Sequence, residues 1–256
     1  MKKKIPITFP FIDGADVNAV NKAVRFGWGK RCYDEIFKLE DSFRKLFNFK
    51  YAFATSSCTG ALHIGLKSID LKKNDEVILP DCTWISCSNA IEYLGAKPIF
   101  ADIKKDTWCI DPIDVEKKIT KKTKAILCVH LYGNVCEMNK LLKIKQKYNL
   151  KLIEDCAEAL GAKYNNLPVG SFSDFAVFSF HGTKLVTGGE GGIFVTNTKE
   201  ISNNFKKYHN MGTSAQETRY FFHNTIGFKY KISNIQAALI NSQLKKIQKF
   251  IKIKKK

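Results

Sequence analysis

The sequence contains no uninterrupted apolar run of the roughly 18 residues that a membrane-spanning helix needs. Its start, MKKKIPITFPFIDGAD, places Asp13 and two prolines where a signal peptide would have its apolar segment. We therefore expect a soluble, cytoplasmic protein. The chain also has no internal repeat and no linker rich in Pro, Gly or Ser, so its 256 residues suffice for one large domain or two small ones.

Arginine is scarce although the chain is strongly basic. Only four of the 42 basic residues are arginine, and the formal net charge is +18. Arginine is the residue favoured for bidentate recognition of phosphates and bases, so its scarcity argues against a nucleic-acid-binding surface. We expect no nucleic acid and no membrane as a partner, and keep polyanion binding through the terminal KKIQKFIKIKKK as an alternative.

The eight cysteines form no C-x-x-C pair and no spacing typical of zinc sites. Several lie inside apolar runs, as in LCVH and IEDCAEA. This distribution indicates small buried residues in a reducing compartment, and we expect no metal site.

Apolar strands alternate with amphipathic helices along most of the chain, which predicts an α/β fold with a mostly parallel sheet between helices. The predicted strands are YAFATSS, EVILP, KPIFADI, KAILCVHLYG and LKLIED, followed by residues 175–180 and 191–196. Predicted helices span residues 13–25, 35–47, 59–69, 83–94, 113–119, 137–148 and 199–208, with one final helix after Ser233. Functional groups of such sheets gather at the carboxyl ends of the strands.

The stretch FAVFSFHGTKLVTGGEGGIFVT places Lys184 between two predicted strands, beside a Gly-Gly-Glu-Gly-Gly run. Such glycines allow a loop to approach a flat ligand closely. Lys184 is either a solvated surface charge or a desolvated amine at the edge of a core. We assign no chemistry to Glu190, and interpret His130 and His181 as pocket-wall or core groups.

Three other positions supply complementary groups. Ser57 and Thr59 lie at a predicted helix N-terminus, which favours an anion such as phosphate, although ordinary capping gives the same pattern. Asp155 ends a strand, and Trp84 follows another, either as a ring partner or as a core residue. Together with Lys184, these positions offer a site for a phosphate, a flat partner for a ring, a carboxylate and an amine. Pyridoxal phosphate needs all four of these groups.

The motifs TSSCTGALHIGL, LPDCTWISCSNAI, IEDCAEALGA, FSFHGTKLVTGGEGG and IGFKYKISNIQAAL occur in this order. The chain thereby resembles the DegT/DnrJ/EryC1/StrS sugar aminotransferases, which have the fold type I of pyridoxal-phosphate-dependent transferases. The resemblance implies that Lys184 forms the Schiff base, Asp155 holds the pyridine nitrogen and Trp84 stacks on the ring. It also implies that Ser57, Cys58, Thr59 and Ser179 hold the phosphate, and that Glu158 lies near the ring oxygen.

The same resemblance implies a substrate class and an assembly. EDCAEALG looks most like the perosamine-synthase branch, which transfers an amine from glutamate or glutamine to C4 of a nucleotide-linked 4-keto-6-deoxysugar for polysaccharide such as lipopolysaccharide O-antigen. A homodimer with shared active sites would place Lys229, where many relatives have Asn, at the neighbouring subunit's cofactor. Cys58 replaces the usual glycine of the phosphate turn. Lys184 in place of His disfavours the related dehydratase branch.

The resemblance also implies a division of the chain. Residues 1–232 would form the cofactor-binding large domain with an N-terminal arm, and residues 233–256 would begin the helix that leads to a small C-terminal domain, which we expect to be missing. Besides polyanion binding, two functions therefore remain open: an active aminotransferase, or a truncated, non-catalytic relative that binds the cofactor or pairs with a full-length subunit.

Overall fold

The computed structural model describes residues 9–213, 218–219 and 222–254. Seven strands form one sheet in the order β1-β9-β8-β5-β4-β2-β3. They are β1 (Tyr51–Thr55), β2 (Glu76–Pro80), β3 (Lys97–Ala101), β4 (Thr123–Val129), β5 (Lys151–Asp155), β8 (Phe175–Ser179) and β9 (Gly192–Thr196). Only β9 among them runs antiparallel to its neighbours, and the other adjacent pairs are parallel. The predicted mostly parallel sheet is confirmed.

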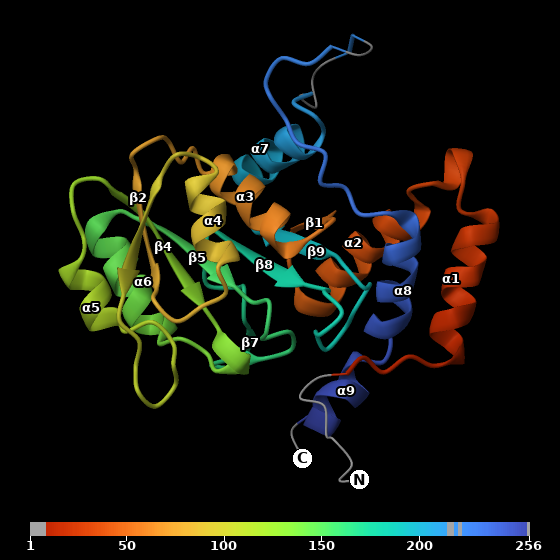
Figure 1. The fold of residues 1–256 in the computed structure, drawn as a ribbon, viewed down its shortest axis with the longest axis horizontal. Helices are drawn as coiled ribbons and strands as arrows, with labels where there is room; N and C mark the ends of the chain where they lie inside the picture. Colours follow the sequence, from red (N-terminus) through yellow and green to blue (C-terminus); the bar gives the residue numbers. More distant parts are fainter. Residues whose placement is uncertain (1–8, 214–217, 220–221, 255–256) are drawn as a thin grey trace, which may run out of the picture.

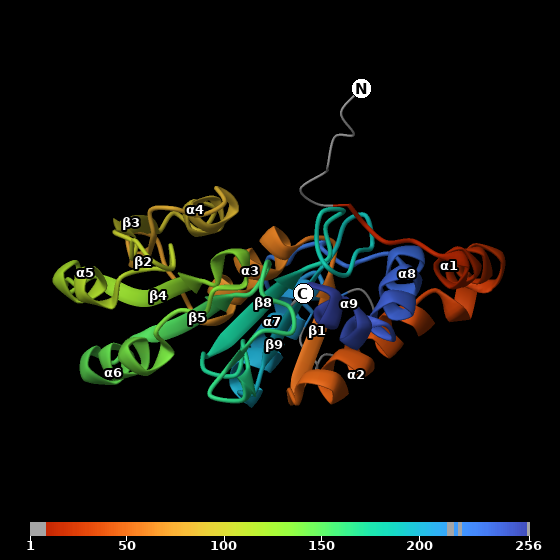
Figure 2. The same cartoon turned by 90° about the horizontal axis from the view of Figure 1, so that it is seen from below.

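Helices cover both faces of this sheet (Figure 1). The helices are α1 (Gly14–Phe26), which packs against α8, and α2 (Asp34–Phe47), α3 (Cys58–Ser68), α4 (Ser86–Glu92), α5 (Pro112–Lys117), α6 (Met138–Tyr148), α7 (Lys199–His209), α8 (Asn234–Leu244) and α9 (Ile247–Lys254). Side chains of α3, α4 and α7 share one apolar core with the sheet. Those of α5 and α6 share a second core, and those of α2, α8 and α9 a third. Figure 2 shows α4 and α6 on opposite sides of β4.

The alternation of side chains along β5 connects these layers. Ile153 packs in the core beneath α3 and α4, whereas Leu152 packs in the core beneath α6. Because successive strand residues point to opposite faces, Asp155 lies on the α3 and α4 side and Glu154 on the α6 side. The two neighbouring acids therefore have different surroundings.

The final helix differs from the prediction. Instead of one helix after Ser233, the chain forms α8 and α9, separated at Lys245 and Lys246. The break turns Ile247 and Phe250 into the core that α2 shares with the sheet. Hydrophobic spacing could not reveal it because both segments have helical periodicity, and only their packing partners differ.

Loops contain further elements that the sequence did not predict. A short hairpin of β6 (Lys163–Tyr164) and β7 (Leu167–Pro168) follows β5, and 3₁₀ turns occupy η1 (Gly29–Arg31) and η2 (Leu131–Gly133). Of the predicted N-terminal arm, residues 1–8 lie outside the described part, while Phe11 packs edge-on against Phe250. None of the helices in the described residues is long and apolar enough to cross a membrane.

Candidate active site

A cavity of about 700 Å³ opens at the edge of the sheet where the parallel strands end. Its walls come from the segments that follow β1, β2, β3, β4, β5 and β8, together with the turn that leads into the reversed strand β9. Ligands of open α/β sheets bind at this edge because several loops converge there. The cavity brings together eight residues predicted for the site: Ser57, Cys58, Thr59, Trp84, Asp155, Glu158, Ser179 and Lys184.

Lys184 lies in the loop after β8, and its side chain is 21% exposed. The Nζ atom donates to Oε1 of Glu158 at 3.1 Å. The second carboxylate oxygen, Oε2, accepts the Tyr132 N–H at 2.9 Å. Lys184 is therefore an amine held at the cavity wall, and the alternative of a freely solvated surface charge does not describe its environment.

Asp155 is the last residue of β5, and 5% of it is exposed. Its Oδ1 accepts the Ala157 N–H at 2.9 Å, and its Oδ2 accepts the thiol of Cys87 at 3.2 Å. Burial raises the pKa of this carboxyl more than these hydrogen bonds and the nearby Lys184 charge lower it. A neutral thiol is a weak donor, so a cationic N–H donor in the cavity would stabilise the carboxylate much better.

The N-terminus of α3 forms another wall. The Ser57 Oγ accepts the Gly60 N–H at 3.0 Å and caps the helix, so the ordinary capping interpretation holds in this structure. Ser57, Cys58 and Thr59 also line the cavity, where N–H groups at a helix start favour an anion. The replacement of glycine by Cys58 fits, because Cys58 is the first helical residue and is absent from the described non-glycine residues with positive φ.

Close packing of β9 supports this turn. A Cβ atom at Gly192, the first residue of β9, would lie 2.5 Å from the Cys58 backbone nitrogen. Only glycine permits that approach without displacing the helix start. Gly192 therefore allows β9 to lie against the start of α3. We call the residues there, Ser57, Cys58 and Thr59, the anion seat.

Trp84 is 77% exposed, although it lines the cavity. The alternative that it is a core tryptophan is therefore wrong. A large aromatic surface left open inside a cavity suits a planar ligand, which gains stacking and burial there.

Of the remaining predicted site residues, Ser179 lies at the cavity and Lys229 lies away from it. Ser179 is buried at the end of β8, and its Oγ accepts the His181 N–H at 3.3 Å at the cavity wall. Lys229 is exposed and does not line the cavity of this chain. Its predicted role at a neighbouring subunit's cofactor stays a prediction.

The structure adds residues that sequence reasoning missed. Trp108 and Tyr132 line the cavity, are 54% and 80% exposed, and have φ values of +60° and +51°. Left-handed backbone at non-glycine residues is costly and gathers at functional sites. Tyr132 lies at the end of the predicted strand KAILCVHLYG with no motif to single it out, and Trp108 carries no signal because its turn conformation is not encoded in residue type alone. Cys87, which contacts Asp155, lay hidden in a predicted helix.

These residues fit pyridoxal phosphate. Asp155 is a buried carboxylate that accepts one backbone N–H and one weakly donating thiol, and it suits the ring nitrogen of that group. The amine at the same wall, the open indole and the helix start suit its aldehyde, ring face and phosphate. The cavity volume lies in the range typical of small-molecule sites. Fold and site together define a pyridoxal-phosphate-dependent enzyme.

Comparison with known proteins gives the particular family. Residues 10–256 match the model of the DegT/DnrJ/EryC1/StrS aminotransferase family, and the chain belongs to that family. It is 40% identical to the GDP-perosamine synthase of Escherichia coli O157:H7 over 99% of this chain and 69% of that protein. The GDP-perosamine synthase of Vibrio cholerae is 36% identical over 98% and 68%.

Solved structures share the fold. The aminotransferase PseC of Helicobacter pylori, described as involved in the biosynthesis of pseudoaminic acid, superposes with a TM-score of 0.88 at 30% identity, covering 96% of this chain and 66% of that one. A Streptococcus pneumoniae structure in its PLP form has a TM-score of 0.87 at 28% identity, with 96% and 68% covered. The chain thus spans about two thirds of the length of these relatives. Family, fold type and pyridoxal phosphate as the expected cofactor are confirmed.

Proposed function

We propose that this protein transfers an amino group from glutamate or glutamine to a nucleotide-linked 4-keto-6-deoxysugar, as a perosamine synthase does. The observation that carries the proposal is the convergence of Lys184 and Asp155 on one cavity, since their chemistry is that of an amine and an acid acting on one ring. The substrate class is supported by the two relatives that are GDP-perosamine synthases. Its product would serve polysaccharide synthesis, as for an O-antigen, in the cytoplasm.

Pyridoxal phosphate, when bound, supplies an aldehyde for the amine and a ring that withdraws electrons. The Lys184 Nζ would hold the group and would carry a proton from Cα of the amino donor to the cofactor in the first half of the cycle. In the second half the same amine would carry a proton from the cofactor to the sugar carbon that receives nitrogen. Glu158, which accepts from Nζ at 3.1 Å, would keep this amine at the cavity wall.

Asp155 and Trp84 orient the ring. The Asp155 carboxylate would hold a protonated ring nitrogen, which relieves the unfavourable burial of the acid. The exposed Trp84 indole would cover one face of the ring and exclude water from it. The Ser57 and Thr59 hydroxyls, the α3 N–H groups and Ser179 would receive the phosphate.

We further propose a homodimer in which Lys229 of one subunit approaches the phosphate of the other as a point charge. In support, Lys229 is exposed and does not line the cavity of its own chain. The division into a large domain of residues 1–232 and a helix leading to a small domain remains part of this proposal.

Covalent capture tests the proposal. The protein is incubated with pyridoxal phosphate, reduced with borohydride and digested, and the modified peptide is identified by mass spectrometry. We expect one adduct on Lys184, its loss in Lys184→Ala and its retention in Lys163→Ala, an exposed lysine outside the cavity. Absence of the Lys184 adduct from the wild type would reject cofactor binding. An adduct without amino transfer from glutamate or glutamine to GDP-4-keto-6-deoxymannose would favour the non-catalytic alternative.

A further inference from the structure

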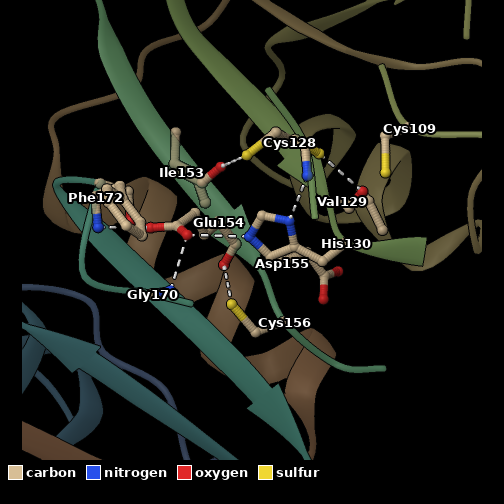
Figure 3. Close-up of polar contacts among 12 residues, drawn as sticks. Cys109, Cys128, Val129, His130, Ile153, Glu154, Asp155, Cys156, Gly170 and Phe172 are labelled. Carbon is tan, nitrogen blue, oxygen red and sulfur yellow. Dashed lines mark hydrogen bonds and ion pairs between the residues drawn. The ribbon is translucent and has the colours of Figure 1, made fainter. Parts of the chain in front are cut away.

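A buried acid and a buried histidine lie directly behind the cavity. Glu154 is the penultimate residue of β5, His130 follows the neighbouring parallel strand β4, and both side chains are 0% exposed. The His130 Nε2 and the Glu154 Oε2 are 3.0 Å apart (Figure 3). Neither residue lines the cavity.

Every polar atom of this pair is hydrogen-bonded. Glu154 accepts the Gly170 N–H at Oε2, 2.8 Å, and the Phe172 N–H at Oε1, 3.0 Å. His130 Nδ1 accepts the Cys136 N–H at 3.2 Å, which leaves Nε2 as the nitrogen that donates to Glu154. The pair thereby ties together β5, the loop after β4 and the loop after β7.

Such a pair is poorly explained by stability alone. Removing a carboxylate from water is costly, and well-packed apolar residues often replace a buried polar pair without loss of stability. A fully satisfied polar network does, however, hold its members in one arrangement.

The network is joined to Asp155 through the backbone. The His130 N–H donates to the Asp155 carbonyl at 3.1 Å, and Val129 pairs with Asp155 in the parallel register. Glu154 is the preceding residue, with its side chain on the opposite face of the sheet. Holding Glu154 on the α6 side therefore fixes the direction in which the Asp155 carboxylate enters the cavity.

We propose that Glu154 and His130 are a positioning pair that fixes the Asp155 carboxylate and so strengthens binding of the cofactor's pyridine nitrogen. This inference rests on the proposed function. A metal centre is the competing role, since ligand atoms of His130, Glu154 and Cys156 lie within 4.8 Å of one another. Metal binding would have to displace the N–H donors of Gly170, Phe172 and His130, and for this reason the hydrogen-bonded pair is favoured.

The test compares Glu154→Gln with Glu116→Gln, the same change at a partly exposed residue that bonds Lys147 and Tyr148 outside this network. We expect Glu154→Gln to weaken pyridoxal phosphate binding roughly tenfold, the size of one disturbed buried hydrogen bond. In the cofactor-free protein, amide exchange of the peptide containing Ala157 should accelerate, because Asp155 Oδ1 accepts that N–H. Glu116→Gln should leave both quantities unchanged.

A second pair of variants keeps the test decisive if Glu154→Gln does not fold. His130→Gln retains a donor and an acceptor, whereas His130→Leu retains neither, so only the former should preserve cofactor affinity and slow exchange at Ala157. The proposal would be overturned if the variants melt at a lower temperature but match the wild type in affinity for pyridoxal phosphate and in amide exchange at Ala157. It would also be overturned if the wild type binds one zinc ion per chain and His130→Leu abolishes that binding. Failure of the wild type to bind pyridoxal phosphate would instead reject the proposed function.

Discussion

The Nζ atom of Lys184 lies 3.1 Å from Oε1 of Glu158, while Oε2 of the same carboxylate accepts the Tyr132 N–H at 2.9 Å. One acid thus holds both the Lys184 amine and a residue with left-handed backbone at the cavity wall. The arrangement keeps the amine ordered in the cavity before the cofactor arrives. It also means that an ion pair must open before the amine reacts.

Glu158→Gln should therefore accelerate attachment of pyridoxal phosphate to Lys184. Partly exposed ion pairs contribute about 0.2–1 kcal/mol, so the expected gain in rate is about one and a half- to fivefold. Stopped-flow absorbance measures this rate, and Glu190→Gln is a suitable control because Glu190 lines the same cavity and is 3.6 Å from His181 rather than bonded to Lys184. A slower rate in Glu158→Gln would show that Glu158 assists the attack.

Asp155→Asn should separate stability from function. Burial raises the pKa of Asp155, so its contribution to folding stability is full at low pH and is lost as pH rises through the folded pKa. At pH 8 the cofactor-free variant should accordingly melt at a higher temperature than the cofactor-free wild type. With cofactor bound, the half-reaction with the amino donor should slow about 100-fold, because the variant lacks a charge-assisted hydrogen bond to the ring nitrogen. Calorimetry and single-turnover kinetics measure the two effects. An unchanged half-reaction would remove Asp155 from the proposed mechanism.

Gly192→Ala should disrupt the anion seat. Its Cβ would lie 2.5 Å from the Cys58 nitrogen, and relieving that overlap must move β9 or the start of α3. We expect about 1–3 kcal/mol less unfolding stability and weaker binding of inorganic phosphate. The matched control is Gly182→Ala, whose Cβ would meet its nearest atom, the Gly189 carbonyl oxygen, at an ordinary 3.6 Å. Normal phosphate binding by Gly192→Ala would contradict the assignment of this turn.

Glu40→Gln should stabilise the protein in alkaline solution. Glu40 accepts the Ala54 N–H at 2.9 Å, and burial raises its pKa to about 7. This group's contribution is present below its unfolded pKa and is lost as pH rises through about 7. The variant should gain about 1–3 kcal/mol at pH 8 and match the wild type at pH 4. Urea unfolding at both pH values measures this difference in unfolding free energy, and Glu92→Gln, at an exposed residue, is the control. An equal gain in stability at pH 4 and pH 8 would exclude a titration effect.

Much of the site could be predicted because its residues follow local patterns. Lys184 lies in a glycine-rich loop, Asp155 ends an apolar strand and Ser57 begins an amphipathic helix, and each pattern depends only on nearby residues. Tyr132 and Trp108 could be placed in the cavity only from the fold, because their positive φ values are imposed by the surrounding loops. Sequence reasoning likewise left Trp84 open between core and cavity, and its exposure of 77% decides for the cavity.

The sequence by itself determined the succession of strands and helices, the mostly parallel sheet and the family, because hydrophobic periodicity and motif order are local and linear properties. Tertiary structure alone decided that β9 inserts between β1 and β8, that the last helix breaks at Lys245, and that Glu158 holds Lys184. It also decided that Glu154 pairs with His130 on the face of the sheet opposite Asp155. These relations join residues distant in the chain, and their energies depend on burial and packing that exist only once the layers have assembled.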